Sequence, residues 1–272
     1  MRRHRRAADV EPLDVDRIET GLATDRVGGK ILVFRETAST NDIAGQYRLR
    51  AENDGLCVFA EHQTAGRGRQ GNRWLAEPGE SLLGSVLLIG WSRSAADILT
   101  LVSAVATTEA VSRTGISAAR IKWPNDVLIG DEKVAGILVE THATGPRDCA
   151  VIGVGINCHQ DRGFFDRAGL AGHATSIDLH RSQPVDRNDL ARDLIRSLDR
   201  WLALALEDRS AVIEAWKRWS SQLGRRVVLE YDRRRFSGHC IGVDPVHGLI
   251  LHLDRGGVRA FPARHSHILP TR

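Results

Sequence analysis

Apolar residues in the first half of the chain fall into short runs that predict buried strands. Residues 31–34 (ILVF), 56–62 (LCVFAEH) and 81–90 (SLLGSVLLIG) are such runs, each bounded by polar residues or glycine. The third run is apolar at nearly every position, which is typical of a central strand covered on both faces. Residues 121–140 predict three more strands, separated by a proline-containing bend and a Gly-Asp turn, and residues 151–157 (VIGVGIN) predict another.

Helical periodicity appears between and after these runs. Residues 13–22 predict a short helix, and residues 95–114 repeat apolar side chains at helical spacing until a glycine ends the pattern. Two further segments, 186–206 and 210–222, predict a helical pair that Gly224 ends. We expect these helices to cover the sheet that the strands form.

From residue 225 onward the pattern changes to short strands separated by turns. These strands are expected at 226–231, 235–244, 248–253 and 257–261. Closely spaced strands after a helical pair predict a small separate β-barrel. We therefore divide the chain into a basic arm (1–12), expected to be disordered, a main domain (13–223) and a C-terminal barrel (224–272).

Composition is that of a soluble globular protein, with 42% hydrophobic and 26% charged residues. The longest apolar run, near residues 81–91, is too short to span a bilayer, and no apolar segment follows the basic N-terminus as a secretory signal would require. The four cysteines are widely spaced and form no CxxC pair. This spacing favours buried thiols in a reducing cytoplasm over a zinc site or a disulfide framework.

The net charge is +4, and only four of the 38 basic residues are lysines. The arginine bias extends over the whole chain, so it is weak support for nucleic-acid binding. Two of the lysines, Lys122 and Lys133, fall within one stretch of twelve residues. Where arginine is the default cation, a retained lysine suggests a role that needs a compact point charge.

Residues 63–74 (QTAGRGRQGNRW) combine glycines with three arginines directly after a predicted strand. Glycine allows positive φ and a close approach of the backbone to a ligand, and arginine offers a fork of donors to carboxylate or phosphate. The segment therefore predicts a loop that binds an anionic small molecule. By itself it is equally compatible with a solvated surface turn.

Two more polar clusters flank predicted strands. In the segment ETASTND, a helix N-cap would explain one of Ser39, Thr40 and Asn41, but three together could also offer hydroxyl and amide groups to a ligand. Asn125 and Asp126, after the proline bend, have the oxygen ligands that Mg²⁺ prefers, although such turns are also common without a function.

Glycines interrupt two of the predicted strands. Gly136 in the strand after Lys133 suggests close approach by a ligand or a neighbour, and the strand VIGVGIN allows the same two interpretations. That strand lacks the GxGxxG spacing and the following helix of a dinucleotide-binding fold, which we therefore reject.

Taken together, the clusters supply neutral hydrogen-bonding groups, an anion-binding loop of arginine and glycine, a pair of possible metal ligands and a lysine. This inventory suits the attack of a carboxylate on the α-phosphate of ATP, because fixed cations are needed where two anions meet. The motifs GRGRQG with a Trp three residues on, KWPNDVLI followed by KVAGILVE, ETASTND and VIGVGIN closely resemble those of biotin–protein ligases in order and spacing.

This resemblance covers roughly residues 13–270 and implies an α+β fold related to class II aminoacyl-tRNA synthetases. Such a fold has a mixed, largely antiparallel sheet flanked by helices, and the C-terminal barrel in the family is of the SH3-like type. The implied reaction is the ATP-dependent formation of biotinoyl-5′-AMP with release of pyrophosphate. Transfer of biotin to a specific lysine of a biotin carboxyl carrier protein or domain of a biotin-dependent carboxylase then releases AMP.

The resemblance also implies the site residues. Biotin contacts are expected at Ser39, Thr40, Asn41, Gln63, Arg67, Gly68, Arg69, Lys133 and Gly136. ATP contacts are expected at Arg69, Arg73, Trp74, Lys122, Asn125, Asp126 and Asn157. The catalytic residues are expected to be Lys133, Arg69 and Asp126, with Asp126 and Asn125 as ligands of Mg²⁺.

Lys133 would hold the biotin carboxylate and the α-phosphate together, and the Gly/Arg loop would close over the adenylate and keep water away. Two departures from the family pattern stand out. Asn72 occupies a position where members usually have an arginine, so that Arg73 is a candidate substitute, and the last barrel strand, ARHSHI, differs from the usual acidic-hydrophobic ending.

Some family members carry an N-terminal winged helix, for which the residues before the first predicted strand are too few. We therefore expect a ligase without sequence-specific DNA binding and without a membrane partner, either as a monomer or as a homodimer. Lipoate or octanoate attachment uses the same fold but needs no ureido-binding polar set. A non-catalytic ligand sensor would not need Lys133 or Asp126, and a nucleic-acid-binding protein would cluster basic residues with aromatics on one face.

Overall fold

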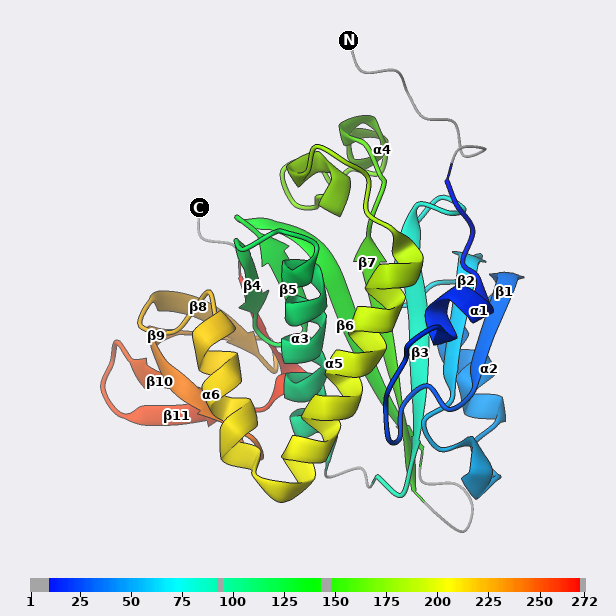
Figure 1. Cartoon of the computed structure of the whole chain (residues 1–272). Helices are drawn as coiled ribbons and strands as arrows, with labels where there is room; N and C mark the ends of the chain where they lie inside the picture. The colour runs from blue at the N-terminus through cyan, green and yellow to red at the C-terminus, as the bar shows by residue number, and fades with distance from the viewer. Residues whose placement is uncertain (1–9, 92–94, 143–147, 270–272) are drawn as a thin grey trace.

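The computed structural model describes residues 10–91, 95–142 and 148–269. Its main feature is a seven-stranded sheet in the order β1-β2-β3-β7-β6-β5-β4, with β1 and β2 parallel and the other neighbours antiparallel (Figure 1). The strands are β1 (Ile31–Thr37), β2 (Cys57–Gln63), β3 (Ser81–Ile89), β4 (Ala119–Lys122), β5 (Asp126–Ile129), β6 (Glu132–His142) and β7 (Cys149–Asn157). The prediction of a mixed, largely antiparallel sheet flanked by helices is confirmed.

The apolar run that predicted a central strand forms β3. All nine of its residues are buried, and it pairs with β7 from Ser81 opposite Asn157 to Ile89 opposite Cys149. Alternate β3 side chains enter different clusters: Leu82 and Leu88 join the main core, whereas Leu87 joins a smaller cluster on the other face. Burial on both faces explains why the run is apolar rather than alternating.

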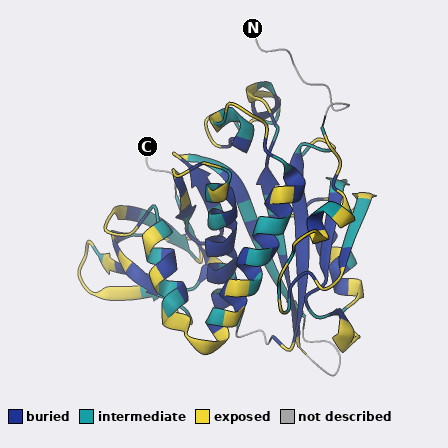
Figure 2. Cartoon of the chain, viewed as in Figure 1, coloured by how far each residue is buried: buried dark blue, intermediate teal, exposed yellow. Residues whose placement is uncertain are grey.

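The helices divide between the two faces of the sheet. The front face in Figure 1 carries α1 (Val15–Glu19), α3 (Ala96–Arg113), α5 (Arg187–Glu207) and α6 (Arg209–Trp219), which enclose the main core with the sheet. The short helix α2 (Thr40–Gln46) packs on β2, β3 and β7 from the other side. The long helices lie within one to three residues of their predicted bounds, and α3, beside α5, is buried along most of its length (Figure 2).

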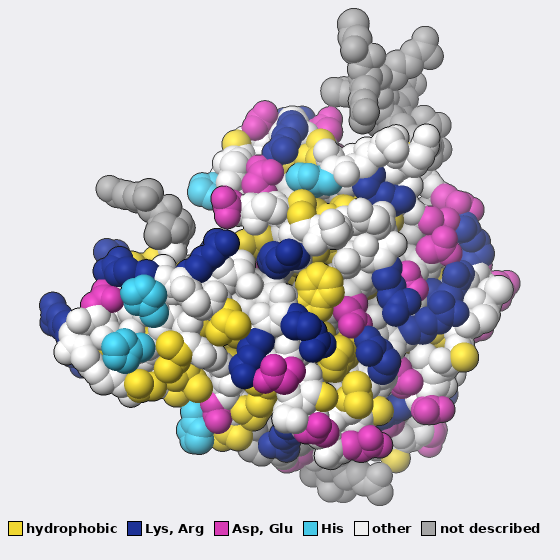
Figure 3. Space-filling view, turned by 60° about the vertical axis from the view of Figure 1, so that its left-hand side comes forward, with side chains coloured by type: hydrophobic (Ala, Val, Ile, Leu, Met, Phe, Trp, Pro, Cys, Tyr) yellow, Lys and Arg dark blue, Asp and Glu magenta, His cyan; other side chains and the backbone are white. Residues whose placement is uncertain are grey.

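The C-terminal residues form a second, five-stranded antiparallel sheet in the order β11-β10-β9-β8-β12. Its strands are β8 (Arg226–Tyr231), β9 (Arg234–Asp244), β10 (Gly248–Leu253), β11 (Val258–Phe261) and β12 (Ser266–Ile268). A short 3-10 helix, η6 (Ala263–His265), precedes β12. Over the face that carries this sheet and α6, basic and acidic side chains are interspersed (Figure 3).

Five short helical segments of the described chain were not predicted, because each is too brief to show a period in the sequence. They are η2 (Ala51–Asn53), η3 (Arg69–Gly71), α4 (Arg162–Arg167), η5 (Ile177–His180) and η6. None of the described helices is long and apolar enough to cross a membrane.

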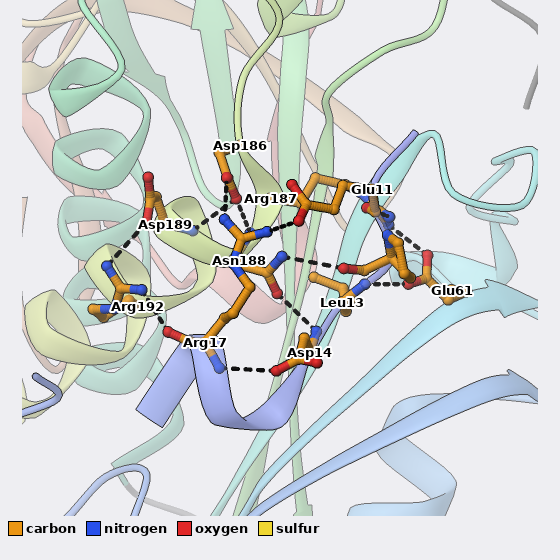
Figure 4. Close-up of polar contacts among 11 residues, drawn as sticks. Glu11, Leu13, Asp14, Arg17, Glu61, Asp186, Arg187, Asn188, Asp189 and Arg192 are labelled. Atoms are coloured by element: carbon orange, nitrogen blue, oxygen red, sulfur yellow. Dashed lines mark hydrogen bonds and ion pairs between the residues drawn. The ribbon is translucent and has the colours of Figure 1, made fainter. Parts of the chain in front are cut away.

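A polar cluster attaches the N-terminal segment to the start of α5 (Figure 4). Arg187 is 3% exposed; its Nη1 lies 2.6 Å from Glu61 Oε2 and its Nη2 donates to the Glu11 carbonyl at 2.8 Å. Asn188 Nδ2 donates to the Pro12 carbonyl at 3.1 Å. Within the predicted arm (1–12), residues 1–9 lie outside the described residues, and Glu11 and Pro12 are held in this cluster.

Candidate functional site

A cavity of about 330 Å³ lies on the sheet face opposite α3 and α5. It brings together the three polar clusters that the sequence singled out. The predicted site residues that line it are Ser39, Thr40, Asn41, Gln63, Arg67, Gly68, Arg69, Arg73, Trp74, Lys122, Asn125, Asp126, Lys133 and Gly136. The segments that provide them lie up to about a hundred residues apart in the chain, so the sheet order alone makes them neighbours.

Asn157 is the one predicted residue that the structure does not bring to the cavity. It ends β7 and is buried, and its Nδ2 donates to the Thr175 carbonyl at 2.9 Å. This hydrogen bond holds the segment that follows β7, and the expected contact of Asn157 with ATP stays a prediction.

Glycines on β6 and β7 form part of the floor of the cavity. A β-carbon at Gly153 would collide with the Asn41 amide, and one at Gly155 would lie 2.5 Å from the Trp74 ring. At Gly136 a β-carbon would come within 3.0 Å of both Trp74 and Lys133. The glycines in these strands are therefore needed for close approach, one of the two interpretations that the sequence allowed.

The neutral polar residues form a hydrogen-bonded set at one end of the cavity. Gln63 Oε1 accepts from the Thr40 backbone N–H at 2.7 Å and from the Thr40 hydroxyl at 3.1 Å. Ser85 Oγ lies 2.7 Å from Thr40 Oγ1 and 2.6 Å from Asn41 Oδ1. Ser39 is the N-cap residue of α2 and is 3% exposed, yet its side chain makes no capping hydrogen bond. Its hydroxyl thus keeps its hydrogen-bonding capacity for a ligand.

The Gly/Arg loop is a small hairpin and not an irregular turn. Gly68 N–H donates to the Asn72 carbonyl at 2.7 Å, Trp74 N–H donates to the Gly66 carbonyl at 3.0 Å, and Arg67 pairs with Arg73 as in a strand ladder. At its tip Gln70 and Gly71 adopt φ values of 57° and 80°, and the Asn72 N–H donates to the Arg69 carbonyl at 3.1 Å. Positive φ at both central residues is typical of a type I′ turn.

Arg67, the first loop arginine, is held by two acidic side chains on the sheet side of the loop. Its guanidinium donates to both Asp42 carboxylate oxygens at 2.7 Å and to Glu140 Oε2 at 3.2 Å. The hydrogen bonds from Arg67 hold the pKa of the Asp42 carboxyl below its ordinary value.

Arg69, the second, reaches away from the loop to the C-terminal sheet. Its Nη1 donates to Asn125 Oδ1 at 3.0 Å, and its Nη2 donates to the carbonyls of Ala263, Arg264 and Ser266. Burial lowers the pKa of this guanidinium. The side chain therefore connects the loop, the proline bend and η6.

Arg73 has a different environment from the other two. It is exposed, and with the described residues its side chain makes no hydrogen bond or ion pair. Lys122 is likewise without such a partner in the described part of the chain. Both cations are therefore available to an anion that enters the cavity.

Lys133 and Asp126 face each other across β5 and β6, with 2.6 Å between Nζ and Oδ1. A β-bulge near Val127 shifts the register between the two strands, so that Lys133 and Gly136 both line the cavity although they are three positions apart, an odd number. Lys133 lies opposite Leu128 of β5, and its backbone N–H and carbonyl form hydrogen bonds with residues 173–175. Its ammonium also lies 5.6 Å from the centre of the Trp74 ring.

The predicted metal ligands are adjacent but differently engaged. Asn125 donates from Nδ2 to the Ile137 carbonyl at 2.8 Å, and its Oδ1 is occupied by Arg69. The described residues contain no group of three or more His, Cys, Asp and Glu side chains that could hold a metal. Asp126 alone still suits Mg²⁺, which is commonly bound by one or two carboxylates together with substrate phosphates.

Several residues of the site were not predicted. His267 and Ile268 of β12 line the cavity, and Trp123 Nε1 donates to Ser266 Oγ at 3.0 Å, so the C-terminal sheet forms one wall. Ser85 and Glu140 contact the neutral polar set. A serine within an otherwise apolar strand is a signal that could have identified Ser85. No feature of the sequence indicates that β12 lies beside the cavity.

Comparison with known proteins agrees with this geometry. Residues 33–157 match the model of the biotin/lipoate A/B protein ligase family. The chain is 33% identical to the bifunctional ligase/repressor BirA of Salmonella typhimurium over 254 residues, which cover 90% of this chain and 75% of that protein. It is 34% identical to the biotin–[acetyl-CoA-carboxylase] ligase of Mycobacterium tuberculosis over 233 residues, or 80% of this chain and 82% of that one.

The fold is also similar to that of solved structures. The biotin protein ligase of Aquifex aeolicus in complex with biotin and ATP superposes with a TM-score of 0.75 at 22% identity, covering 89% of this chain and 100% of that one.

Proposed function

The chain belongs to the biotin–protein ligase family, and from this premise we propose that it attaches biotin to a lysine of a carrier protein in an ATP-dependent reaction. One observation carries the proposal for this chain's own residues. The Lys133–Asp126 pair, the neutral polar set and the Gly/Arg loop converge on a single cavity. This arrangement has the groups needed to join a carboxylate to a nucleotide phosphate.

Biotin would enter with its ureido ring at the polar end of the cavity. Ser39, Thr40, Asn41 and Gln63 would hydrogen-bond the ring, and the backbone of Arg67 and Gly68 would close over it. Gly136, in the floor of the cavity, leaves room for the aliphatic chain of biotin to reach Lys133. The biotin carboxylate would then lie beside the Lys133 ammonium.

Lys133 would exchange its Asp126 partner for the biotin carboxylate and the α-phosphate of ATP. Holding these two anions together lowers the barrier to attack of the carboxylate oxygen on phosphorus, which forms biotinoyl-5′-AMP and releases pyrophosphate. Arg73 and Lys122 would contact the phosphates, and Trp74 the adenine ring. Asp126 would be the carboxylate ligand of Mg²⁺, with Asn125 beside it; when bound, the metal neutralises phosphate charge.

Arg69 is expected to act on the loop more than on the phosphates, because its donors are satisfied by Asn125 and by carbonyls of η6 and β12. A loop held in this way would retain the mixed anhydride and exclude water from it. In the second step, the ε-amine of a carrier lysine attacks the biotinyl carbonyl, the amide forms and AMP leaves.

The remaining parts of the proposal concern the surroundings of the site. The acceptor would be a biotin carboxyl carrier protein or domain of a biotin-dependent carboxylase, and the reaction would take place in the cytoplasm. The relationship of the main sheet to class II aminoacyl-tRNA synthetases and of the C-terminal sheet to an SH3-like barrel stays a prediction. So does the choice between monomer and homodimer.

The test is direct. The purified protein is incubated with ATP, Mg²⁺, biotin and an apo carrier domain, and the carrier is probed for covalently bound biotin. We expect labelling that requires ATP and the carrier lysine. A carrier that stays unlabelled with biotin but accepts lipoate would contradict the proposal.

A further inference from the structure

Glu140, near the end of β6, contacts two parts of the site that the reaction above treats separately. Its Oε2 accepts a hydrogen bond from Asn41 Nδ2 at 2.6 Å and another from Arg67 Nη2 at 3.2 Å. Asn41 belongs to the polar pocket and Arg67 to the Gly/Arg loop. The Glu140 side chain is 31% exposed, so it is partly shielded from solvent where it meets them.

The contact with Asn41 fixes the orientation of an amide that would otherwise be free to flip. Glu140 binds the amide nitrogen, and Ser85 Oγ lies 2.6 Å from the amide oxygen on the other side. A flipped amide would place its oxygen against the carboxylate and leave Glu140 Oε2 with only the longer hydrogen bond from Arg67. The amide lies directly over Gly153, where a β-carbon would come within 2.4 Å of Asn41 Oδ1.

In this orientation Asn41 keeps one N–H and one oxygen lone pair for a ligand. A cyclic urea presents the complementary groups, since its N–H donates and its carbonyl accepts. A hydrogen bond to a carboxylate is also stronger than one between neutral groups. The carboxylate thus decides which end of the Asn41 amide faces the ligand.

The contact with Arg67 connects the same carboxylate to the loop. Asp42 binds the Arg67 guanidinium through two hydrogen bonds of 2.7 Å but makes none with Asn41 among the described residues. Glu140 is therefore shared between pocket and loop, whereas Asp42 serves the loop alone. Substitutions of Glu140 and Asp42 can therefore separate the effect on the Asn41 amide from the effect on the loop.

We propose that Glu140 is a positioning residue that orients the Asn41 amide toward the ureido ring and, through Arg67, holds the Gly/Arg loop over the occupied pocket. The inference rests on the proposed function, because it assigns the ureido ring to the polar set. It makes ureido recognition and retention of the adenylate depend on one side chain.

The test compares four variants with the wild-type protein in two measurements. The first measurement is the dissociation constant of biotin without ATP, obtained by calorimetry, and the second is the rate at which biotinoyl-5′-AMP leaves the protein. The variants are Glu140→Ala, Glu140→Gln, Asp42→Asn and the control Glu132→Gln. Glu132 lies on the same strand and pairs with Arg162, but it does not line the cavity.

Glu140→Ala is expected to weaken biotin binding by roughly tenfold to a hundredfold, as the loss of a hydrogen bond to a charged group implies, and to speed adenylate release. Glu140→Gln keeps an acceptor for Asn41 and loses the charge that attracts Arg67, so it should retain most of the biotin affinity but release adenylate faster. Asp42→Asn should change adenylate release alone. Glu132→Gln should match the wild type in both measurements.

If Glu140 only stabilised the fold, its loss would weaken the binding of both biotin and ATP. Steady-state kinetics therefore provide a further readout. For Glu140→Ala, we expect the KM for biotin to rise while the KM for ATP stays unchanged. Should Glu140→Ala fail to fold, Ser85→Ala tests the same orientation from the amide oxygen and is also expected to weaken biotin binding.

Two results would overturn the proposal. One is unchanged biotin affinity in Glu140→Ala, or in Ser85→Ala where that variant replaces it. The other is faster adenylate release in Asp42→Asn but not in either Glu140 variant. Failure of the wild-type protein to bind biotin would instead overturn the proposed function, so the two failures are distinguishable.

Discussion

The Lys133 ammonium lies 2.6 Å from a carboxylate oxygen of Asp126 and beside the face of Trp74. In the proposed reaction this cation faces two substrate anions at the moment when charge develops between them. We expect Lys133→Ala to reduce adenylate formation by about a hundredfold to a thousandfold, the range found for the loss of one such electrostatic group. Pyrophosphate release in the presence of ATP and biotin measures the effect.

Lys217→Ala is the matched control, because Lys217 pairs with Glu214 on the exposed side of α6. It should leave the rate unchanged. The circular dichroism of Lys133→Ala should equal that of the wild type. A Lys133→Ala protein that still forms adenylate at the wild-type rate would refute the role of this side chain.

Arg73 differs from the two other loop arginines because it has no partner among the described residues. If it replaces the arginine usually found at the position of Asn72, Arg73→Ala should raise the KM for ATP by about tenfold to a hundredfold and leave biotin affinity unchanged. Asn72→Ala, which removes a neutral side chain at the next position, is the comparison. A larger effect of Asn72→Ala on ATP would assign the phosphate contact to Asn72 instead.

At the level of elements, Arg69 connects the Gly/Arg loop with η6 and with the proline bend. Its substitution by glycine should mainly weaken retention of the adenylate, because the loop loses its attachment while Lys133 stays in place. The expected signature is faster release of biotinoyl-5′-AMP with nearly normal adenylate formation. Loss of adenylate formation equal to that of Lys133→Ala would indicate direct contact with the phosphates.

The start of α5 depends on Arg187, whose guanidinium is buried and paired with Glu61 of β2. Removing one partner of a buried ion pair leaves the other uncompensated, so Arg187→Ala should lower the free energy of unfolding by about 3–5 kcal/mol. Urea denaturation measures this change.

Arg50→Ala is the control for that experiment, because the Arg50–Glu52 pair is exposed and its nitrogen and oxygen lie 3.6 Å apart. Its effect should not exceed about 1 kcal/mol. Equal effects of the two substitutions would mean that the Arg187 cluster does not hold the N-terminal segment to the sheet.

For the whole molecule, the four cysteines report on the integrity of the core. All four are buried, and burial raises the pKa of Cys57 and Cys158 to about 12 and that of Cys240 to about 11. Since the thiolate is the reactive form, a thiol reagent at pH 8 should modify the native protein slowly and all four cysteines promptly in urea. Prompt modification of the native protein would show that these segments open readily.

Much of the fold could be predicted because burial sets the residue pattern directly. The apolar run of β3 follows from its coverage on both faces, and the helical repeat of α5 follows from having one face on the core. Short elements such as α4 and η6 could not be predicted, since fewer than two helical turns leave no period to detect. Lys133 and the polar clusters were identified by their chemical types and their position at strand ends, whereas the expected role of Trp74 came from the resemblance to biotin–protein ligases.

The sequence by itself determined which strands and helices form and which polar clusters supply the chemistry, because local periodicity and residue type are properties of short segments. Only the tertiary structure decided how these groups meet. The bulge in β5–β6 brings Lys133 to the cavity face, β12 forms a wall of the cavity from the far end of the chain, and Asn157 forms a structural hydrogen bond away from it. Contacts between distant segments depend on register and strand order, which no single stretch of the sequence specifies.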